Sequence, residues 1–398
     1  MRPIRSAIPA LLASAILATS LTGCQFGAPE EDSGEIVIGA DLELSGAAPQ
    51  VGKAYQRALE LRVEQLNESG ALGGRRIRLE VRDNKFDASI SATNIGDFTA
   101  DPAISGIIMG SCNECAIGAA KTVKSKQVPT IALAPAGDVA APGQDREFMF
   151  KLGPNARDNV AALAAELRSR RVETVALLHT ADKYGEEGVA ALRNELVGAE
   201  EDPTDIPIVI RRSVKPTDTD VSQAVGALVE EEPDAVIVWA PADQANLAIT
   251  SLRGEGYRGH VFFDAVAAGD LFIGNSGRAA ENTTMVFTQT MVIDDVIATT
   301  PAKAASKQWF RDYTARFGGY YGYSSFAADA LQLLVDAAVR ADSDSETPNR
   351  GRIRSLLETA ETDGLSGPIR MTPENHSGLM PQALTLLVAR GGRWRLAG

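Results

Sequence analysis

An alternation of strand-like and helix-like segments limits the fold of this chain more than any other feature. Between residues 35 and 264, short apolar or β-branched runs such as EIVIGA (35–40) and AVIVWA (235–240) alternate with longer segments. One of the longer segments, 53–67, places its apolar residues on one face of a helix. Apolar strands separated by helices are typical of parallel sheets that helices cover on both faces. We therefore expect an α/β fold.

The same patterns predict the remaining elements. Two of them bear on the candidate site, a helix over 116–126 and a strand over 261–264. After residue 283 we expect a strand at TMVFTQT and then helices over 302–317, 325–341 and 351–360. Short strands follow at 368–371, 384–389 and 394–396, for which antiparallel pairing is one possibility.

The first residues predict export from the cytoplasm. Two arginines and an apolar run over 7–18 precede LTGC, an order typical of a secretory signal. The run is too short to span the ~30 Å hydrocarbon core of a bilayer as a helix. LTGC resembles the bacterial lipobox, whose cysteine is lipidated, although an ordinary signal peptide with an incidental cysteine is the alternative. We predict that 1–23 is a signal peptide and that lipid on Cys24 anchors the mature chain to the membrane.

The chain after the signal predicts a tether and a large folded part. Residues 24–34 comprise Cys24 and QFGAPEEDSG, which is polar and acidic and is typical of a flexible tether. No later run is apolar and long enough to span a bilayer. The rest of the chain is too long for one ordinary core, and we expect two lobes.

Charge and motifs exclude several functions. The formal net charge of −13 argues against nucleic acid, whose partners carry clustered Lys and Arg. The three histidines, His179, His260 and His376, lack metal-ligand spacing, and we expect neither metal nor cofactor. GEGYRG at 254–259 matches G-x-G-x-x-G, but a predicted helix precedes it and a strand follows, which is the wrong order for a dinucleotide site. No nucleophile motif supports the alternative of an extracytoplasmic hydrolase, and we expect no enzyme.

Two further cysteines, Cys112 and Cys115, form a C-N-E-C pair. Outside the cytoplasm, a local disulfide that rigidifies the loop is the favoured interpretation. Two free thiols and a redox-active pair are the alternatives, and the surrounding sequence does not look like a thioredoxin unit.

Several segments occur in an order and spacing that resembles one family. They are IVIGADLELSG, QLNESGALGGRRIRLEVRDNKFD, VPTIALAPAG, HTADKYGEEGVAAL, PTDTDVSQAVGAL and YYGYSSFAADALQLLVDAA. From Glu35 to Gly398 the chain resembles the type I periplasmic binding proteins. The most similar branch is the branched-chain amino acid (Leu/Ile/Val-type) solute-binding proteins of ABC importers.

The resemblance implies two doubly wound parallel-sheet lobes joined by crossing hinge strands. Lobe 1 would comprise 35–153 plus 285–365, and lobe 2 would comprise 154–284 plus 366–398. A small solute would bind at the carboxyl ends of the strands, and hinge closure would sequester it. The resemblance also implies a monomer on the extracytoplasmic face of the cell membrane that delivers an amino acid or a related amine or amide to ABC permease subunits. A ligand sensor of the same fold, signalling to a membrane partner, is the alternative.

The resemblance carries ligand-contacting roles to particular positions. They are Ser111, Glu114, Ala134, Ala136, Tyr184 and Asp264. The family's carboxylate-binding serine aligns with Glu114, and the alternative alignment makes Ser111 the contact. The loop from Ala134 to Ala136 lacks the hydroxyl side chains that the family has there.

In the second lobe, Tyr184 matches an aromatic that contacts the ligand, and Asp264 matches the acid that binds a ligand ammonium. A packing role for Tyr184 and a solvated turn role for Asp264 are the alternatives. Acids at Glu114 and Asp264 would face the cleft from opposite lobes and repel a carboxylate. We therefore hypothesise a ligand that is neutral or carries an amine or amide, rather than a plain branched-chain amino acid.

Overall fold

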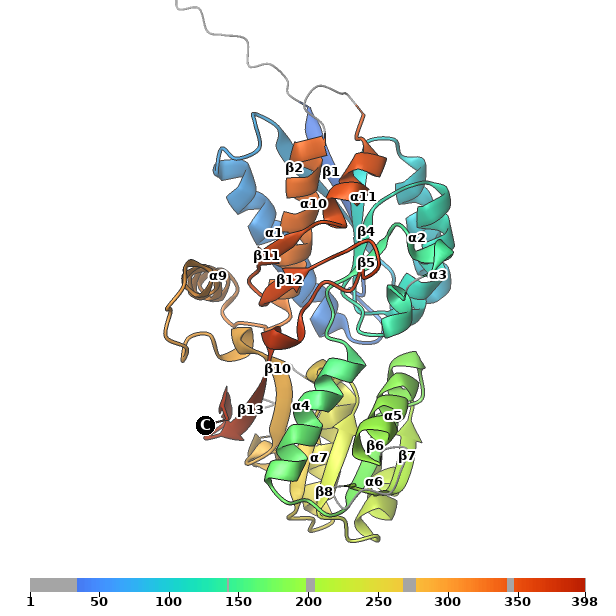
Figure 1. The fold of residues 1–398 in the computed structure, drawn as a ribbon, viewed down its shortest axis with the longest axis vertical. Helices are drawn as coiled ribbons and strands as arrows, with labels where there is room; N and C mark the ends of the chain where they lie inside the picture. Colours follow the sequence, from blue (N-terminus) through green and yellow to red (C-terminus); the bar gives the residue numbers. More distant parts are fainter. Residues whose placement is uncertain (1–33, 142, 198–204, 268–276, 342–346, 398) are drawn as a thin grey trace, which may run out of the picture.

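The computed structural model describes residues 34–141, 143–197, 205–267, 277–341 and 347–397. Two lobes lie one above the other along the long axis of the molecule (Figure 1). The predicted signal peptide and Cys24 lie outside the described residues, as does the predicted tether up to residue 33. Across the described ranges, no helix has the length and apolar character needed to cross a bilayer.

Lobe 1 is built on a five-stranded parallel sheet in the order β2-β1-β3-β4-β5. Its strands are β1 (Glu35–Leu42), β2 (Arg76–Asp83), β3 (Ile104–Met109), β4 (Thr130–Ala132) and β5 (Met149–Lys151). Helices α1 (Pro49–Glu68), α10 (Ser324–Ala341) and α11 (Arg350–Leu357) lie together on one side, and α2 (Ala88–Ala100) and α3 (Asn113–Ser125) lie together on the other (Figure 1).

Lobe 2 is built on a seven-stranded sheet in the order β14-β13-β10-β9-β8-β6-β7. Its strands are β6 (Val175–Thr180), β7 (Ile208–Val214), β8 (Ala235–Trp239), β9 (His260–Phe263), β10 (Thr284–Thr288), β13 (Leu384–Arg390) and β14 (Arg393–Leu396). Its helices are α4 (Ala156–Ser169), α5 (Lys183–Leu196), α6 (Ser222–Val229) and α7 (Ala242–Gly254), with α4 beside α5 and α6 beside α7. Strand β13 pairs antiparallel with both β10 and β14, and all other pairs in the sheet are parallel.

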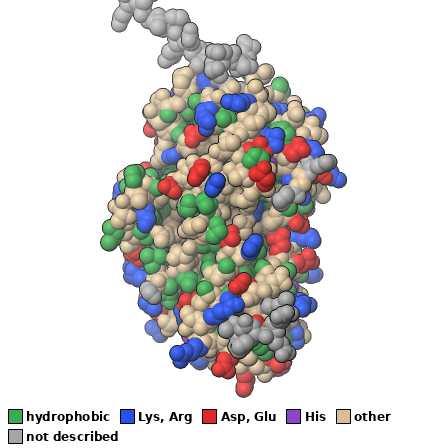
Figure 2. Space-filling model, viewed as in Figure 1, with side chains coloured by type: hydrophobic (Ala, Val, Ile, Leu, Met, Phe, Trp, Pro, Cys, Tyr) green, Lys and Arg blue, Asp and Glu red, His purple; other side chains and the backbone are tan. Residues whose placement is uncertain are grey.

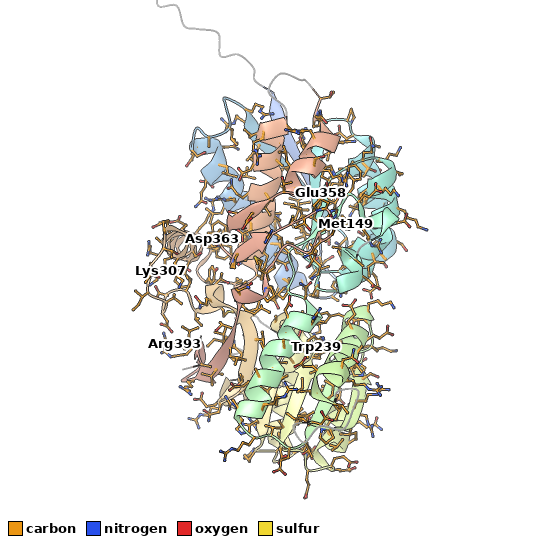
Figure 3. All side chains as sticks on the ribbon, viewed as in Figure 1. Met149, Trp239, Lys307, Glu358, Asp363 and Arg393 are labelled. Atoms are coloured by element: carbon orange, nitrogen blue, oxygen red, sulfur yellow. A yellow bond between two sulfur atoms is a disulfide. The ribbon has the colours of Figure 1, made fainter. Side chains whose placement is uncertain are left out.

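Local sequence explains the boundaries of several elements. All five residues of β8 are buried, as its continuous apolar run predicts. Asp87 and Asp182 accept hydrogen bonds from the first backbone N–H groups of α2 and α5, and these caps begin the two helices. Trp239, at the end of β8, lies inside lobe 2, and Met149, at the start of β5, lies in lobe 1 (Figure 3).

The chain passes between the two sheets three times. The first crossing comes between β5 and β6. The other two expected boundaries are wrong. The pairing of β10 with β9 and β13 keeps residues 284–288 in lobe 2, and β12 (Pro368–Arg370) pairs with β11 (Glu361–Asp363) outside that sheet. The return to lobe 2 therefore comes just before β13, because strand pairing is non-local and is not readable from the order of elements.

Other elements also depart from the prediction, among them β5, β11 and the start of α3. Strand β5 was not predicted, since it has three residues and ends in a lysine, Lys151, which is nevertheless fully buried. Helix α3 begins at Asn113 rather than 116, because Cys112 is its N-cap. Helix α9 (Pro301–Phe317) lies at the side of the molecule and begins at a Thr300 cap. The architecture confirms the predicted α/β class with two sheets.

Candidate functional site

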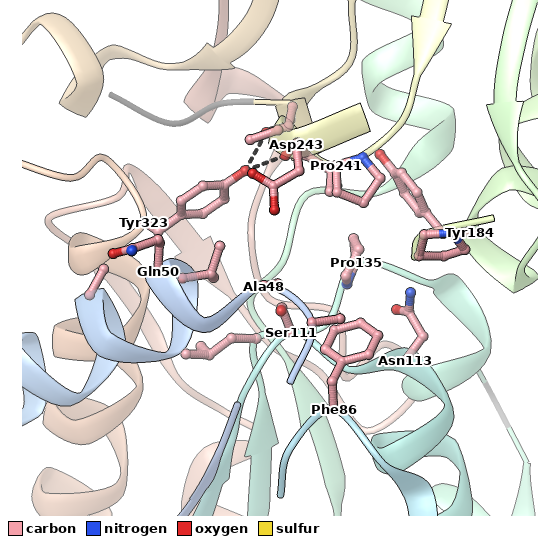
Figure 4. A pocket seen from close by; sticks show the side chains of 18 of the residues that line it. Ala48, Gln50, Phe86, Ser111, Asn113, Pro135, Tyr184, Pro241, Asp243 and Tyr323 are labelled. Carbon is pink, nitrogen blue, oxygen red and sulfur yellow. Dashed lines mark hydrogen bonds between the residues drawn. The ribbon is translucent and has the colours of Figure 1, made fainter. Parts of the chain in front are cut away.

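A cavity lies between the lobes, at the carboxyl ends of the parallel strands (Figure 4). Together with its open mouth it encloses about 1130 Å³. Lobe 1 lines it with Ala47, Ala48, Gln50, Val51, Ala54, Tyr55, Phe86, Ser111, Asn113, Leu133, Pro135, Tyr321, Tyr323 and Phe326. Lobe 2 lines it with Asp182, Tyr184, Pro216, Pro241, Ala242, Asp243, Gln244, Ala265 and Val266, and Pro154 comes from the first crossing. Helices and loops from both lobes thus meet at one space, as in small-molecule sites.

The walls of this cavity are mainly apolar and aromatic. The aromatic residues are Tyr55, Phe86, Tyr184, Tyr321, Tyr323 and Phe326. Two acids, Asp182 and Asp243, also line the cavity, whereas none of its described lining residues is Lys, Arg or His. The outer surface differs, since Figure 2 shows basic and acidic side chains interspersed over the face that it draws.

Ser111 lines the cavity, but its hydrogen bonds point to Glu43. The Ser111 hydroxyl donates to Glu43 Oε1 at 2.6 Å, and the Ser111 N–H donates to both carboxylate oxygens at 3.0 and 3.1 Å. Glu43 follows β1 and is fully buried, which raises the pKa of its carboxyl group. A Cβ on Gly110 would lie 1.9 Å from Glu43 Oε2, so only glycine leaves room for this carboxylate.

Glu43 is not among the predicted site residues. A charged residue directly after an apolar strand was the available signal, and Gly110 at the end of another apolar strand was a second one. The two residues are far apart in the sequence, and only the pairing of β1 with β3 brings them together.

Glu114 does not line the cavity, so the alignment that placed it at the ligand is wrong. The reason is that α3 begins at Asn113. As part of the first turn of that helix, Glu114 is exposed to solvent. A carboxylate at this position is stabilised by the helix dipole. The preceding residue, Asn113, lines the cavity instead, and its Oδ1 accepts a hydrogen bond from Ala136 N–H at 2.8 Å.

Ala134 and Ala136 are fully buried and also do not line the cavity. Leu133 and Pro135, the alternate residues of the same extended segment, face it. Successive side chains of an extended backbone point to opposite sides, and this places the two alanines away from the cleft. Side chains at these two positions therefore do not face the cavity.

Tyr184 lines the cavity as expected, and Asp264 does not. Asp264 is fully buried and accepts hydrogen bonds from Tyr184 Oη at 2.5 Å, from Val266 N at 3.0 Å and from Ala240 N at 3.2 Å. Burial raises the pKa of Asp264 to about 7. Asp264 was expected to face the cleft and bind a ligand ammonium, but it does not line the cavity, and its carboxylate is occupied inside lobe 2.

Hydrogen bonds also run directly between the lobes. Tyr323, before α10, donates to Val266 O at 2.5 Å across the cleft, a contact drawn in Figure 4. In a second contact between the lobes, the Glu187 carboxylate of α5 accepts hydrogen bonds from Gly137 N at 2.7 Å and from Asp138 N at 3.3 Å. These contacts hold the two walls of the cavity close to each other.

The loop that carries Ser111 is closed by a disulfide between Cys112 and Cys115. The three histidines lie apart from the cleft, with His179 bonded to Thr180 O and His376 to Met149 O and Glu358. Within the described ranges, no group of three or more His, Cys, Asp or Glu side chains could hold a metal ion.

Solved structures of similar architecture cover nearly the whole chain. An extracellular ligand-binding receptor from Rhodopseudomonas palustris HaA2 has a TM-score of 0.83 at 21% identity and covers 91% of this chain and 99% of that one. The leucine-binding protein LivK from Thermotoga maritima has a TM-score of 0.78 at 17% identity, covering 91% and 98%. LivJ from Streptococcus pneumoniae, a branched-chain amino acid transporter substrate-binding protein in complex with isoleucine, has a TM-score of 0.77 at 19% identity, covering 91% and 98%. At these identities the likeness establishes the fold.

Sequence comparison identifies the family. No curated protein matched the chain. The family described as periplasmic binding protein matches residues 35–393, which include every strand of the two lobe sheets except most of β14, and every described residue of the cavity. Together with the two-lobed fold and the cleft between the lobes, this match shows that the chain belongs to the periplasmic binding protein family.

Proposed function

We propose that this protein is the solute-binding component of an ABC importer and that it takes a small solute in the cleft between its lobes. One observation carries the proposal: a single cavity is lined from both lobes and from the first crossing. A solute bound there would contact both walls, so binding would favour the closed arrangement of the lobes. The relatives LivK and LivJ are named for binding leucine and branched-chain amino acids, which makes amino acids and related amines or amides the first class to test.

A thermal-shift screen of the purified protein tests this proposal. The probes are amino acids, their amides, polyamines, urea and short peptides. A solute present at 100 times its Kd stabilises the folded protein by ~2.7 kcal/mol, and the melting temperature rises accordingly. A matched variant, Val51→Trp, fills the cavity from α1 and should abolish the shift while the protein stays folded. A solute that stabilises both proteins equally would bind elsewhere, and the proposed site would be rejected.

The proposed location is the extracytoplasmic face of the membrane, with lipid on Cys24 as the anchor. LTGC at the end of an apolar run supports this part of the proposal. Metabolic labelling with an alkyne fatty acid should mark the protein in cells, and Cys24→Ser should lose the label and leave the membrane fraction. Cys112→Ser is the control, since it should keep the label. Release of the unchanged protein as a soluble species would contradict anchoring.

A further inference from the structure

The end of β1 and the loop after β3 bring the Glu43 carboxylate against Ser111, a residue of the cavity wall. Ser111 contributes two donors to the wall of the cavity, its N–H and its hydroxyl. Both already donate to Glu43, at 3.0 and 2.6 Å. Hydrogen-bond donors that are satisfied within the protein are not available to a solute.

The arrangement around Glu43 is built into the fold. The carboxylate is fully buried behind Ser111, and Gly110 leaves the space that it fills. Gly52 of α1 packs against the backbone of the same residue, since a Cβ there would lie 2.1 Å from the carbonyl oxygen of Glu43. Side chains at either glycine position would push Glu43 out of this place. The sequence therefore seats the carboxylate at one position rather than leaving it mobile in the cleft.

The other described side chains of the lining include no cation that could pair with a carboxylate. The described wall of the cavity contains Asp182 and Asp243 and lacks any basic side chain. Aromatic rings line the cavity from both lobes. In lobe 1, Tyr55 packs edge-on against Tyr323, with 6.3 Å between the ring centres. Aromatic faces and carboxylates together favour uncharged apolar groups and organic cations.

We propose that Glu43 is a specificity-determining residue that occupies the Ser111 donors and excludes solutes with a carboxylate at this end of the cleft. The solute class is then an apolar amine or amide without a free carboxylate. This inference rests on the proposed function for its biological meaning, because it names the solute class of the same cleft. The occupancy of Ser111 by Glu43 can be tested without knowing the solute.

The test removes the carboxylate and offers a replacement. In Glu43→Ala, the freed Ser111 donors and the vacated space should bind formate or acetate. These ions should raise the melting temperature of the variant in a saturable way, with binding about 10- to 100-fold tighter than that of acetamide, the neutral isostere of acetate. Chloride at matched ionic strength controls for screening. The unchanged protein and the double variant Glu43→Ala/Ser111→Ala should show no carboxylate-specific shift.

Three outcomes would overturn the inference. They are equal shifts in the unchanged protein and in Glu43→Ala, equal effects of acetate and acetamide, or a carboxylate shift that survives in the double variant. If Glu43→Ala does not fold in chloride, refolding is followed with formate, acetate and acetamide. Recovery with the carboxylates alone supports the inference, and recovery with all three or with none contradicts it. If the unchanged protein binds no solute in the screen, the proposed function fails, and the formate result still decides the role of Glu43.

Discussion

The Tyr184 hydroxyl donates to Asp264 Oδ2 at 2.5 Å, and this bond holds the buried carboxylate inside lobe 2. Tyr184 therefore presents its ring to the cleft while its hydroxyl points away from a solute. The backbone N–H groups of Ala240 and Val266 also donate hydrogen bonds to the Asp264 carboxylate. The pair links the end of β9 to the start of α5, two of the elements that form the lobe 2 wall.

Tyr184→Phe should destabilise the protein. The variant removes one donor from a fully buried carboxylate, and a loss of about 1–3 kcal/mol in the free energy of unfolding is expected. Urea denaturation at constant pH measures it. Tyr321→Phe is the matched control, because Tyr321 also lines the cavity but is only partly buried, and it should change stability by less than about 0.5 kcal/mol. Equal effects of the two variants would argue against the Tyr184–Asp264 bond as a stabilising contact.

Asp264 should make stability fall between about pH 4 and pH 7. Its pKa is raised from 3.8 to about 7 in the folded protein, so the folded state holds the proton over a range in which the unfolded state has lost it. Stability then decreases as pH rises through this range, by up to ~1.4 kcal/mol per pH unit. Asp264→Asn should flatten this part of the profile. A slope that persists unchanged in the variant would assign it to other buried carboxyl groups.

Lys151 should have the opposite effect at higher pH. Its side chain is fully buried in β5, next to the first crossing, and donates to Gly153 O and Asn155 Oδ1. Burial lowers the pKa of Lys151 from 10.5 to about 7, although Glu187 and Asp158 oppose the shift. Between pH 7 and 10.5 the unfolded state binds the extra proton, so stability rises with pH by up to ~1.4 kcal/mol per unit. Lys151→Met should remove this rise in denaturation curves recorded across the range.

Glu187→Ala should weaken solute binding, although Glu187 does not line the cavity. Its carboxylate bridges from α5 to the Gly137 and Asp138 N–H groups of lobe 1, and the bridge favours the closed arrangement. Losing it should raise Kd about two- to tenfold, mainly through faster dissociation. Stopped-flow and calorimetry with a solute from the screen measure both quantities. Glu186→Ala is the control, since Glu186 pairs only with Lys183 on the same helix among the described residues, and it should leave Kd unchanged.

Opening the disulfide should loosen the loop between Ser111 and α3. A disulfide that closes so short a loop restricts the unfolded chain and thereby raises the free energy of unfolding by about 2 kcal/mol. Its loss should lower the melting temperature. Solute affinity should also fall, because Ser111 and Asn113 lie on either side of Cys112. The variant Cys112→Ser/Cys115→Ser is compared with the oxidised protein, and thiol titration reports the redox state. An unchanged melting temperature would mean that the loop is held by other contacts.

The sequence by itself determined the α/β class and the order of nearly all elements. These features depend on local periodicity and capping, as in the apolar run of β8 and the Asp182 cap of α5. It also identified Ser111 and Tyr184, which both line the cleft.

Only the tertiary structure decided what these residues can do in the cleft. Helix α3 begins at its Cys112 cap and turns Glu114 to solvent, and Asp264 is occupied by Tyr184. The pairing of β1 with β3 brings Glu43 to Ser111, although the two are 68 positions apart in the sequence. The direction of a side chain and the partner of a buried carboxylate depend on which distant segments pack together, and local patterns do not contain that information.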